Sequence, residues 1–410
     1  MLQLKNTFVL LIVLCSFSTL SQTMIQTSYL ERKLTPKQIE GYKLLFIEGG
    51  TFNMGQGVDE DILRRVTVSS FYISATEVTN LEYREFLTWI QEYRPQTALD
   101  DLLPDQTIWQ RYIGGNVGDK LAKDYFNLPA FDYYPVVGVS WIQVQLFLEW
   151  KTDRTNEQIA IANGDWTLAM RKKFIFSTDS FLRDLYPNKS ETPQQKKVKN
   201  YILPSYRLPT EAEWEFAAWA LLGKQNSTDQ EEQGIQSYTH VPTTSTRPRH
   251  AISFVNQYRK KVIKHTKKHP VPAYYDHNKY QLPKHVFEGD INRYGIYNMN
   301  DNASEWVVDA YRPISKVVPD VSSSDLNPVI NLDTVKEGEI NAIREFDYKK
   351  VEKPSLNPVE IAAIKRVYKG ANVAQETGKR GPGYRYSERA KGEYTTLIGF
   401  RCAMTRVSLK

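Results

Sequence analysis

Short apolar, aromatic-rich blocks alternate along the chain with three long polar stretches, and this alternation most constrains the fold. The polar stretches run over about 152–200, 225–283 and 313–358 and are rich in Lys, Asn and Thr. Unstructured loops of that length are improbable inside a compact domain. We therefore expect a single α+β domain over residues 41–407, with these stretches as insertions, some of which carry helices of their own. An N-terminal arm over residues 22–40 precedes the domain.

The blocks predict a small set of regular elements. Residues 41–54 have the pattern of strand, turn and strand, and the alternating run 66–79 predicts a third strand. Capping signals predict three helices. The first runs from Asn80 to Tyr93, with Thr79 as its N-cap and Glu82 three residues later. The second follows the N-cap Ser140 and runs to Trp150, and the third begins at a capping box made of Thr210 and Glu213 and ends at Gly223. Hydrophobic residues make up 41% of the chain and aromatic residues 12%, enough for a packed core.

The first 21 residues have the pattern of a secretory signal peptide. One Lys precedes an apolar run too short to span a membrane stably, and small and polar residues follow, which allows cleavage before Gln22. The competing interpretation is a lipoprotein signal in which Cys15 is acylated, although the bulky Leu14 precedes the thiol. Both interpretations place the mature chain outside the cytoplasm. We expect a periplasmic protein, associated with the outer membrane if it is acylated.

The chain contains two cysteines, Cys15 and Cys402, so that removal of the signal leaves one thiol. A mature chain with one cysteine has no internal disulfide, and its stability must come from burial. We expect Cys402 to be a small buried residue in a C-terminal strand.

The net charge of +6 is uneven, with a basic block at residues 247–268. An exported chain has little occasion to meet nucleic acid, so we expect no nucleic-acid partner. Contact with an anionic surface such as peptidoglycan is one interpretation of the block, and a solvated loop is the other.

The histidines are concentrated in the same part of the chain. His265 and His269 have i, i+4 spacing, which would suit a metal on a helix, but five lysines around them would repel a cation. A basic, pH-sensitive surface is the favoured interpretation. The six histidines are His240, His250, His265, His269, His277 and His285.

Several blocks, in order along the chain, carry a family resemblance. They read IEGGTFNMG, FYISATEVTNLEYREF, YPVVGVSW, YRLPTEAEWEFAA, YGIYNMNDNASEW, RVYKGANV and IGFRCA. Together they resemble the formylglycine-generating enzyme/sulfatase-modifying-factor family from about Phe46 to Arg406. The resemblance implies that family's irregular α+β fold with little regular secondary structure, which is related to C-type lectin domains.

Further blocks narrow the resemblance to one branch. PDQTIW at residues 104–109, DYFNLPAFDYYPVVGVSW and FLEWKT are similar to the gliding-motility lipoproteins K and J, ring-forming components of the type IX secretion system. This similarity implies a non-catalytic structural component with protein partners in a cell-envelope secretion or motility ring.

The oxidase chemistry of the family requires two cysteines five positions apart, for Cu(I) binding and disulfide exchange with substrate. When the motif is laid on KGA at residues 369–371, these positions fall at about Gln375 and Arg380. Neither side chain can replace a thiolate. We therefore expect a pseudoenzyme without copper.

The resemblance also implies a calcium site in residues 294–306. Carried over position by position, its ligands would be the side chains of Asn298 and Glu305 and the backbone carbonyls of Asp301 and Ala303. Asp301 replaces the usual glycine. The alternative is a calcium-free turn in which Asn298 and Glu305 bond the backbone N–H groups of the loop.

Two other functions stay open from the sequence. One is a lectin-like module that binds glycan or peptidoglycan. The other is an unrecognised oxidoreductase of the same family that uses Arg380, Arg385 and Tyr386 to bind an anionic substrate.

Overall fold

The computed structural model of the chain describes residues 44–55, 64–95, 97, 99–182, 202–219, 249–311, 364–373, 382–390 and 397–406. The chain divides into two compact units. The first comprises Met1–Tyr42, Thr152–Leu203 and Leu409–Lys410, and the second comprises Lys43–Lys151 and Pro204–Ser408. Residues 152–203, which include the first expected insertion, thus belong to the first unit.

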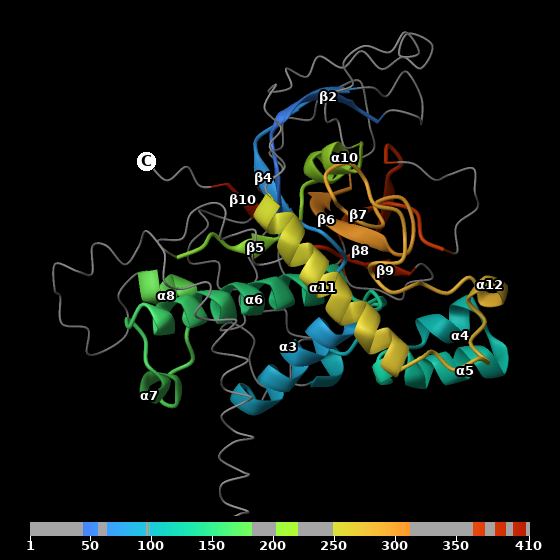
Figure 1. Cartoon of the computed structure of the whole chain (residues 1–410), viewed down its shortest axis with the longest axis horizontal. Helices are drawn as coiled ribbons and strands as arrows, with labels where there is room; N and C mark the ends of the chain where they lie inside the picture. Colours follow the sequence, from blue (N-terminus) through green and yellow to red (C-terminus); the bar gives the residue numbers. More distant parts are fainter. Residues whose placement is uncertain are drawn as a thin grey trace, which may run out of the picture. The chain divides into compact units, whose positions relative to one another are not determined.

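Among the described residues of the second unit, short strands form three sheets (Figure 1). The strands are β1 (Leu44–Ile47), β2 (Gly50–Met54), β3 (Arg64–Val68), β4 (Phe71–Ser74), β5 (Tyr206–Arg207), β6 (Ser304–Ala310), β7 (Lys365–Lys369), β8 (Tyr386–Arg389), β9 (Ile398–Gly399) and β10 (Ala403–Thr405).

Strand pairing joins distant parts of the chain. The first sheet has the order β1-β4-β10-β5, so β10, near the C-terminus, lies between β4 and β5, which are both about 200 or more positions earlier in the chain. The second sheet has the order β8-β7-β6-β9, with β6 and β9 parallel, and the third contains β2 and β3. These pairings bring residues near 75, 300 and 400 together.

Helices account for most of the remaining regular structure. They are α3 (Asn80–Tyr93), α4 (Ile108–Tyr112), α5 (Gly115–Asp124), α6 (Trp141–Ala162), α7 (Leu168–Arg171), α8 (Thr178–Leu182), α10 (Glu211–Trp219), α11 (Arg249–Lys268), α12 (His277–Tyr280) and the 3₁₀ turns η3 (Leu99–Asp101) and η4 (Pro129–Phe131).

The three expected helix starts are confirmed by single hydrogen bonds. At the start of α6, Ser140 Oγ accepts from the Gln143 N–H at 3.2 Å and Gln143 Oε1 accepts from the Ser140 N–H at 2.7 Å. The Thr79 side chain accepts from the Glu82 backbone N–H while the Glu82 carboxylate accepts from the Thr79 N–H. Thr210 and Glu213 form the same reciprocal pair at the start of α10. The expected end of that helix, Gly223, lies outside the described residues.

The expected strand, turn and strand over residues 41–54 is confirmed by β1 and β2, which pair with β4 and β3 respectively. Two other expectations about local structure were wrong. Helix α6 continues past Trp150 to Ala162, into the stretch assigned to an insertion. The run 66–79 is not one strand, because Ser69 and Ser70 separate β3 from β4.

One hydrophobic cluster of the second unit fixes the elements around the site. It joins β1, β4, α10, α11, β6 and β7 through buried side chains that include Leu45, Ile73, Trp214, Val262, Val307 and Val367. Burial of each large apolar side chain contributes about 1.5–3 kcal/mol. The first unit has a smaller cluster made of Ala160, Trp166, Phe176 and Phe181.

Candidate functional site

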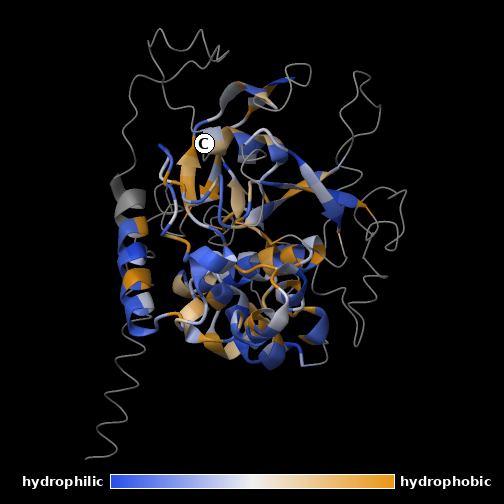
Figure 2. Cartoon of the chain, turned by 90° about the vertical axis from the view of Figure 1, so that its right-hand side faces the viewer, coloured by the Kyte–Doolittle hydropathy of each residue, from blue (hydrophilic) through white to orange (hydrophobic). Residues whose placement is uncertain are grey.

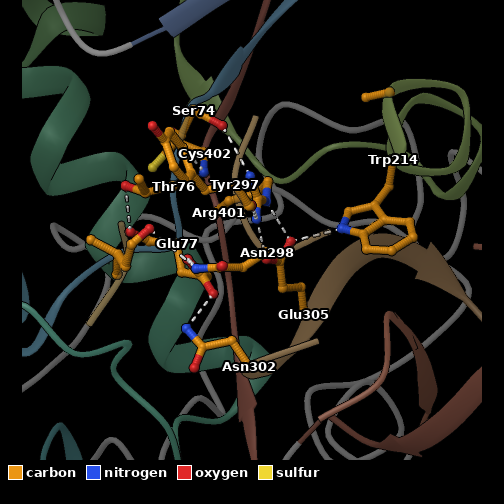
Figure 3. A network of polar contacts seen from close by, with 12 residues as sticks. Ser74, Thr76, Glu77, Trp214, Tyr297, Asn298, Asn302, Glu305, Arg401 and Cys402 are labelled. Atoms are coloured by element: carbon orange, nitrogen blue, oxygen red, sulfur yellow. Dashed lines mark hydrogen bonds and ion pairs between the residues drawn. The ribbon is translucent and has the colours of Figure 1, made fainter. Parts of the chain in front are cut away.

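The expected calcium segment forms a turn that leads into β6. Asn298 has φ 59° and Asn302 has φ 76°, a left-handed conformation that asparagine tolerates better than most residues. Both side chains are buried. The turn therefore directs two amides and the Glu305 carboxylate into the interior (Figure 3).

Glu305 is held by two residues from distant parts of the chain. Arg401 donates from Nε to Oε2 and from Nη2 to Oε1, each at 2.6 Å. Trp214 of α10 donates from Nε1 to Oε2 at 2.7 Å. Arg401 also donates to the carbonyls of Ser74 and Tyr297, so it links the first sheet to the turn. A bidentate ion pair that is buried from solvent holds its two side chains in a defined relative orientation.

Glu77 completes the network from the segment between β4 and α3. Its carboxylate accepts from Asn298 Nδ2 at 3.0 Å and from Asn302 Nδ2 at 2.8 Å. Burial raises the pKa of Glu77 to about 7 against the opposing charge of Arg401, and the nearby Glu305 adds to the rise. Burial works to lower the pKa of Arg401, but Glu305 and Glu77 together raise it above its usual value. Arg401 therefore stays cationic and balances one of the two carboxylates.

The Glu305 carboxylate is not free to bind a calcium ion in this arrangement. Both Glu305 oxygens face the Arg401 guanidinium, whose charge would repel a second cation. One observation favours an ion: Asn298 Oδ1 is buried without a hydrogen-bond partner among the described residues. Asp301 and Ala303 lie in the turn as expected. Calcium binding remains a prediction of the resemblance.

A second charged cluster lies at Lys369, the last residue of β7. Lys369 is fully buried and donates from Nζ to Glu215 Oε2 at 2.8 Å, with Glu211 Oε1 at 3.6 Å. Glu215 Oε1 also accepts from the Gly55 N–H. Helix α10 thus presents two carboxylates that fix the end of β7.

A buried acid with a raised pKa, Asp309, contacts the start of the same helix. Asp309 Oδ2 accepts from the Glu211 backbone N–H at 2.6 Å. Burial raises the pKa of Asp309 to about 6, and the neighbouring Glu211 carboxylate adds to the rise while Arg385 opposes it.

The positions that replace the family's cysteine pair, Gln375 and Arg380, lie outside the described residues, as does Cys15. Cys402 is 1% exposed, as expected, but immediately precedes β10 and does not lie in it. Arg385 forms an ion pair with Glu211, and Tyr386 stacks on Tyr368 with ring centroids 5.2 Å apart. Arg385 is therefore already engaged by a carboxylate of the protein.

The described histidines take up separate structural roles. His265 Nε2 lies 2.9 Å from Asp132 Oδ2, and its ring is 4.6 Å from that of His269. Burial lowers the pKa of His285, which lies 3.4 Å from Glu288. Within the described ranges, no group of three or more His, Cys, Asp or Glu side chains could hold a metal ion.

Sequence reasoning missed Glu77, Arg401, Glu215 and Lys369 as members of buried charge networks. A signal was present, because each lies in an apolar block where a charged residue is unexpected unless it is paired. The blocks are FYISATEVTN, IGFRCA, TEAEWEFAA and RVYKGANV.

The match to a family model now defines the class of protein. The model described as sulfatase-modifying factor enzyme 1-like domain, of the FGE-sulfatase family, matches residues 31–406. The chain belongs to this family, and the expected α+β fold is confirmed.

Solved structures of other proteins match this chain over most of its length, at low sequence identity. Treponema denticola variable protein 1 is 20% identical with a TM-score of 0.37, over 88% of this chain and 95% of that chain. CarF is 16% identical with a TM-score of 0.38, over 89% and 98%. PvdO from Pseudomonas aeruginosa is 15% identical with a TM-score of 0.39, over 88% and 94%.

No curated protein matches the chain. Among the described residues, no helix has the length and apolar character needed to cross a membrane.

Proposed function

We propose that the chain is a non-catalytic member of its family and serves as a structural component of a cell-envelope machine, on the periplasmic side of the outer membrane. The observation that carries this proposal is the cysteine inventory. A copper-dependent thiol oxidase needs two thiolates in the loop after β7, and no cysteine stands between Cys15 and Cys402. Cys402 cannot take over that role, because it is buried beside the first sheet.

The charged groups near that loop support a structural role. Lys369 pairs with Glu215, Arg385 with Glu211, and Arg401 with Glu305. Charges that neutralise one another inside the protein hold elements in place and leave little to act on a substrate. This arrangement weighs against an oxidoreductase that uses Arg385 to bind an anion.

The particular machine we propose is the type IX secretion and gliding apparatus, on the resemblance to lipoproteins K and J. The blocks that carry this resemblance build an aromatic cluster. Trp109 is fully buried, with its ring 4.4 Å from Tyr125, which lies 5.1 Å from Phe131. A packed aromatic cluster gives a rigid scaffold, which suits a ring subunit.

The test is recovery of the tagged full-length chain from cross-linked envelope fractions, with an untagged strain as control. Mass spectrometry identifies the partners and the mature N-terminus. Recovery with secretion-machinery proteins in a fixed ratio is the expected result. Recovery of the chain alone, with a free Gln22 terminus, would overturn the proposal.

A further inference from the structure

Helix α11 is anchored to the second unit along one side. Val255 and Val262 are buried, and the Tyr258 ring packs against Phe287 with centroids 5.3 Å apart. His265 reaches Asp132, and the His269 backbone N–H bonds the His265 carbonyl. These residues follow the i, i+3, i+4 spacing of one helical face. The helix is therefore fixed in place and does not hang free.

The opposite side of α11 carries a dense row of positive charge. We define the basic stripe as Arg259, Lys260, Lys261, Lys264, Lys267 and Lys268, all of which are exposed. At 1.5 Å per residue the stripe extends about 14 Å along the helix. No Asp or Glu occurs from residue 247 to residue 275. In Figure 2 the helix shows separate hydrophilic and hydrophobic bands.

Several other cationic residues of the second unit are paired. Arg84, Lys151 and Arg207 each pair with a carboxylate, as do the buried Lys369 and Arg401. Within the part of the chain that the structure describes, no stripe residue forms an ion pair. Repulsion among six like charges disfavours the free surface, so an anionic partner gains by neutralising them.

The surroundings of the stripe restrict the class of partner. A bilayer takes up an amphipathic helix through its apolar face, and here that face is buried in the protein. A globular protein partner needs apolar or aromatic anchors, and lysine is depleted in such interfaces. Single-stranded nucleic acid needs aromatic platforms between the charges, and the stripe contains none.

We propose that the basic stripe binds an acidic polysaccharide that runs along α11, with its carboxylates neutralised by the lysines. A linear polymer with regularly spaced negative charges can lie along the basic stripe, because the stripe follows a single face of the helix. Binding releases counterions, so the affinity must fall steeply with salt. This proposal stands apart from the secretion role and does not depend on it.

The test uses the full-length protein and fluorescently labelled polygalacturonate in anisotropy titrations at several salt concentrations. The triple variant Lys260→Gln, Lys261→Gln, Lys264→Gln removes half of the stripe and keeps helix propensity. We expect it to bind at least ~10-fold more weakly at low salt, with a slope of log K against log salt reduced by about 2. The matched control, Lys172→Gln, Lys173→Gln, Lys365→Gln, removes the same charge from exposed positions outside α11. It should retain wild-type binding.

Circular dichroism confirms that each variant is folded before the titrations are compared. Equal loss in the two triple variants, or no binding by the wild type, would overturn the proposal. Binding of a dT20 oligonucleotide or of phosphatidylglycerol vesicles without binding of polygalacturonate would also overturn the proposal.

Discussion

The Arg401 guanidinium meets both carboxylate oxygens of Glu305 at 2.6 Å, inside the protein and across 96 positions of sequence. Arg401 is 0% exposed and so is Glu305. The pair connects the C-terminal block to the turn in which relatives are expected to hold calcium. It is the structural centre of the site.

Removal of one partner should be far more damaging than removal of both. Arg401→Met leaves Glu305 buried without its cation, and we expect a loss of about 3–5 kcal/mol in the free energy of unfolding. The double variant Arg401→Met, Glu305→Gln should recover part of that loss because position 305 no longer carries a buried charge without its cation. Urea unfolding measures all three proteins.

The matched control for this cycle is the exposed pair Arg111–Asp105. Asp105→Asn should cost at most about 1 kcal/mol. A loss in Arg401→Met no larger than this would mean that the buried pair does not hold the site together.

Gly289 leaves no room for a side chain beside the turn. A Cβ at this position would lie 1.9 Å from Asn298 Oδ1. We expect Gly289→Ala to destabilise by about 2–3 kcal/mol, because the Asn298 amide must move away from Glu77. Thermal unfolding reports the loss. Gly164→Ala, at φ 79° with open space around it, is the comparison and should cost about 1 kcal/mol. Similar costs at both positions would argue against a tightly packed turn.

Asp309 should make stability fall as the pH rises. Its pKa is raised from 3.8 to about 6, so between these values the folded protein keeps a proton that the unfolded chain has lost. The free energy of unfolding therefore decreases through this window, and above about pH 6 the loss is complete. Asp309→Asn keeps the acceptor for the Glu211 N–H and cannot ionise. Relative to wild type, it should gain about 2 kcal/mol between pH 4 and pH 7. A constant difference across that range would show that Asp309 does not titrate as described.

Because Arg401 already donates hydrogen bonds to both Glu305 oxygens, calcium should leave the stability of the protein unchanged. A ligand at 1,000 times its Kd stabilises by about 4 kcal/mol, which a melting curve detects readily. We expect equal Tm values in millimolar calcium, millimolar magnesium and EDTA. A Tm rise specific to calcium would show that the expected ligands do bind the ion.

Local features of the fold could be predicted from the sequence because they depend on neighbouring residues. The capping boxes at Thr79 and Thr210 each need only three following positions. The strand pairing could not be predicted, because Ser69 and Ser70 break one alternating run and β4 has partners from both ends of the chain. The end of α6 was missed because its second half is polar and resembles a loop.

For the site, the sequence pointed to the right segment but not to its chemistry. Asn298 lies in the buried turn, and Glu305 lies in β6, which follows that turn directly. Their partners, Glu77 and Arg401, are 221 and 96 positions away, and no spacing rule connects them. Tertiary packing decides whether Glu305 meets a metal or a guanidinium, so the sequence left both open.

The absence of oxidase chemistry is the central claim and has a direct test. The purified protein, supplied with Cu(I) and oxygen, is incubated with a cysteine-containing peptide substrate of the family, and mass spectrometry measures conversion of the cysteine to formylglycine. A catalytically competent relative serves as the positive control. The account predicts no conversion above the protein-free background, because the resemblance puts Gln375 and Arg380 at about the positions where the oxidase needs two thiolates, and no cysteine stands between Cys15 and Cys402. Catalytic turnover of the peptide would contradict it.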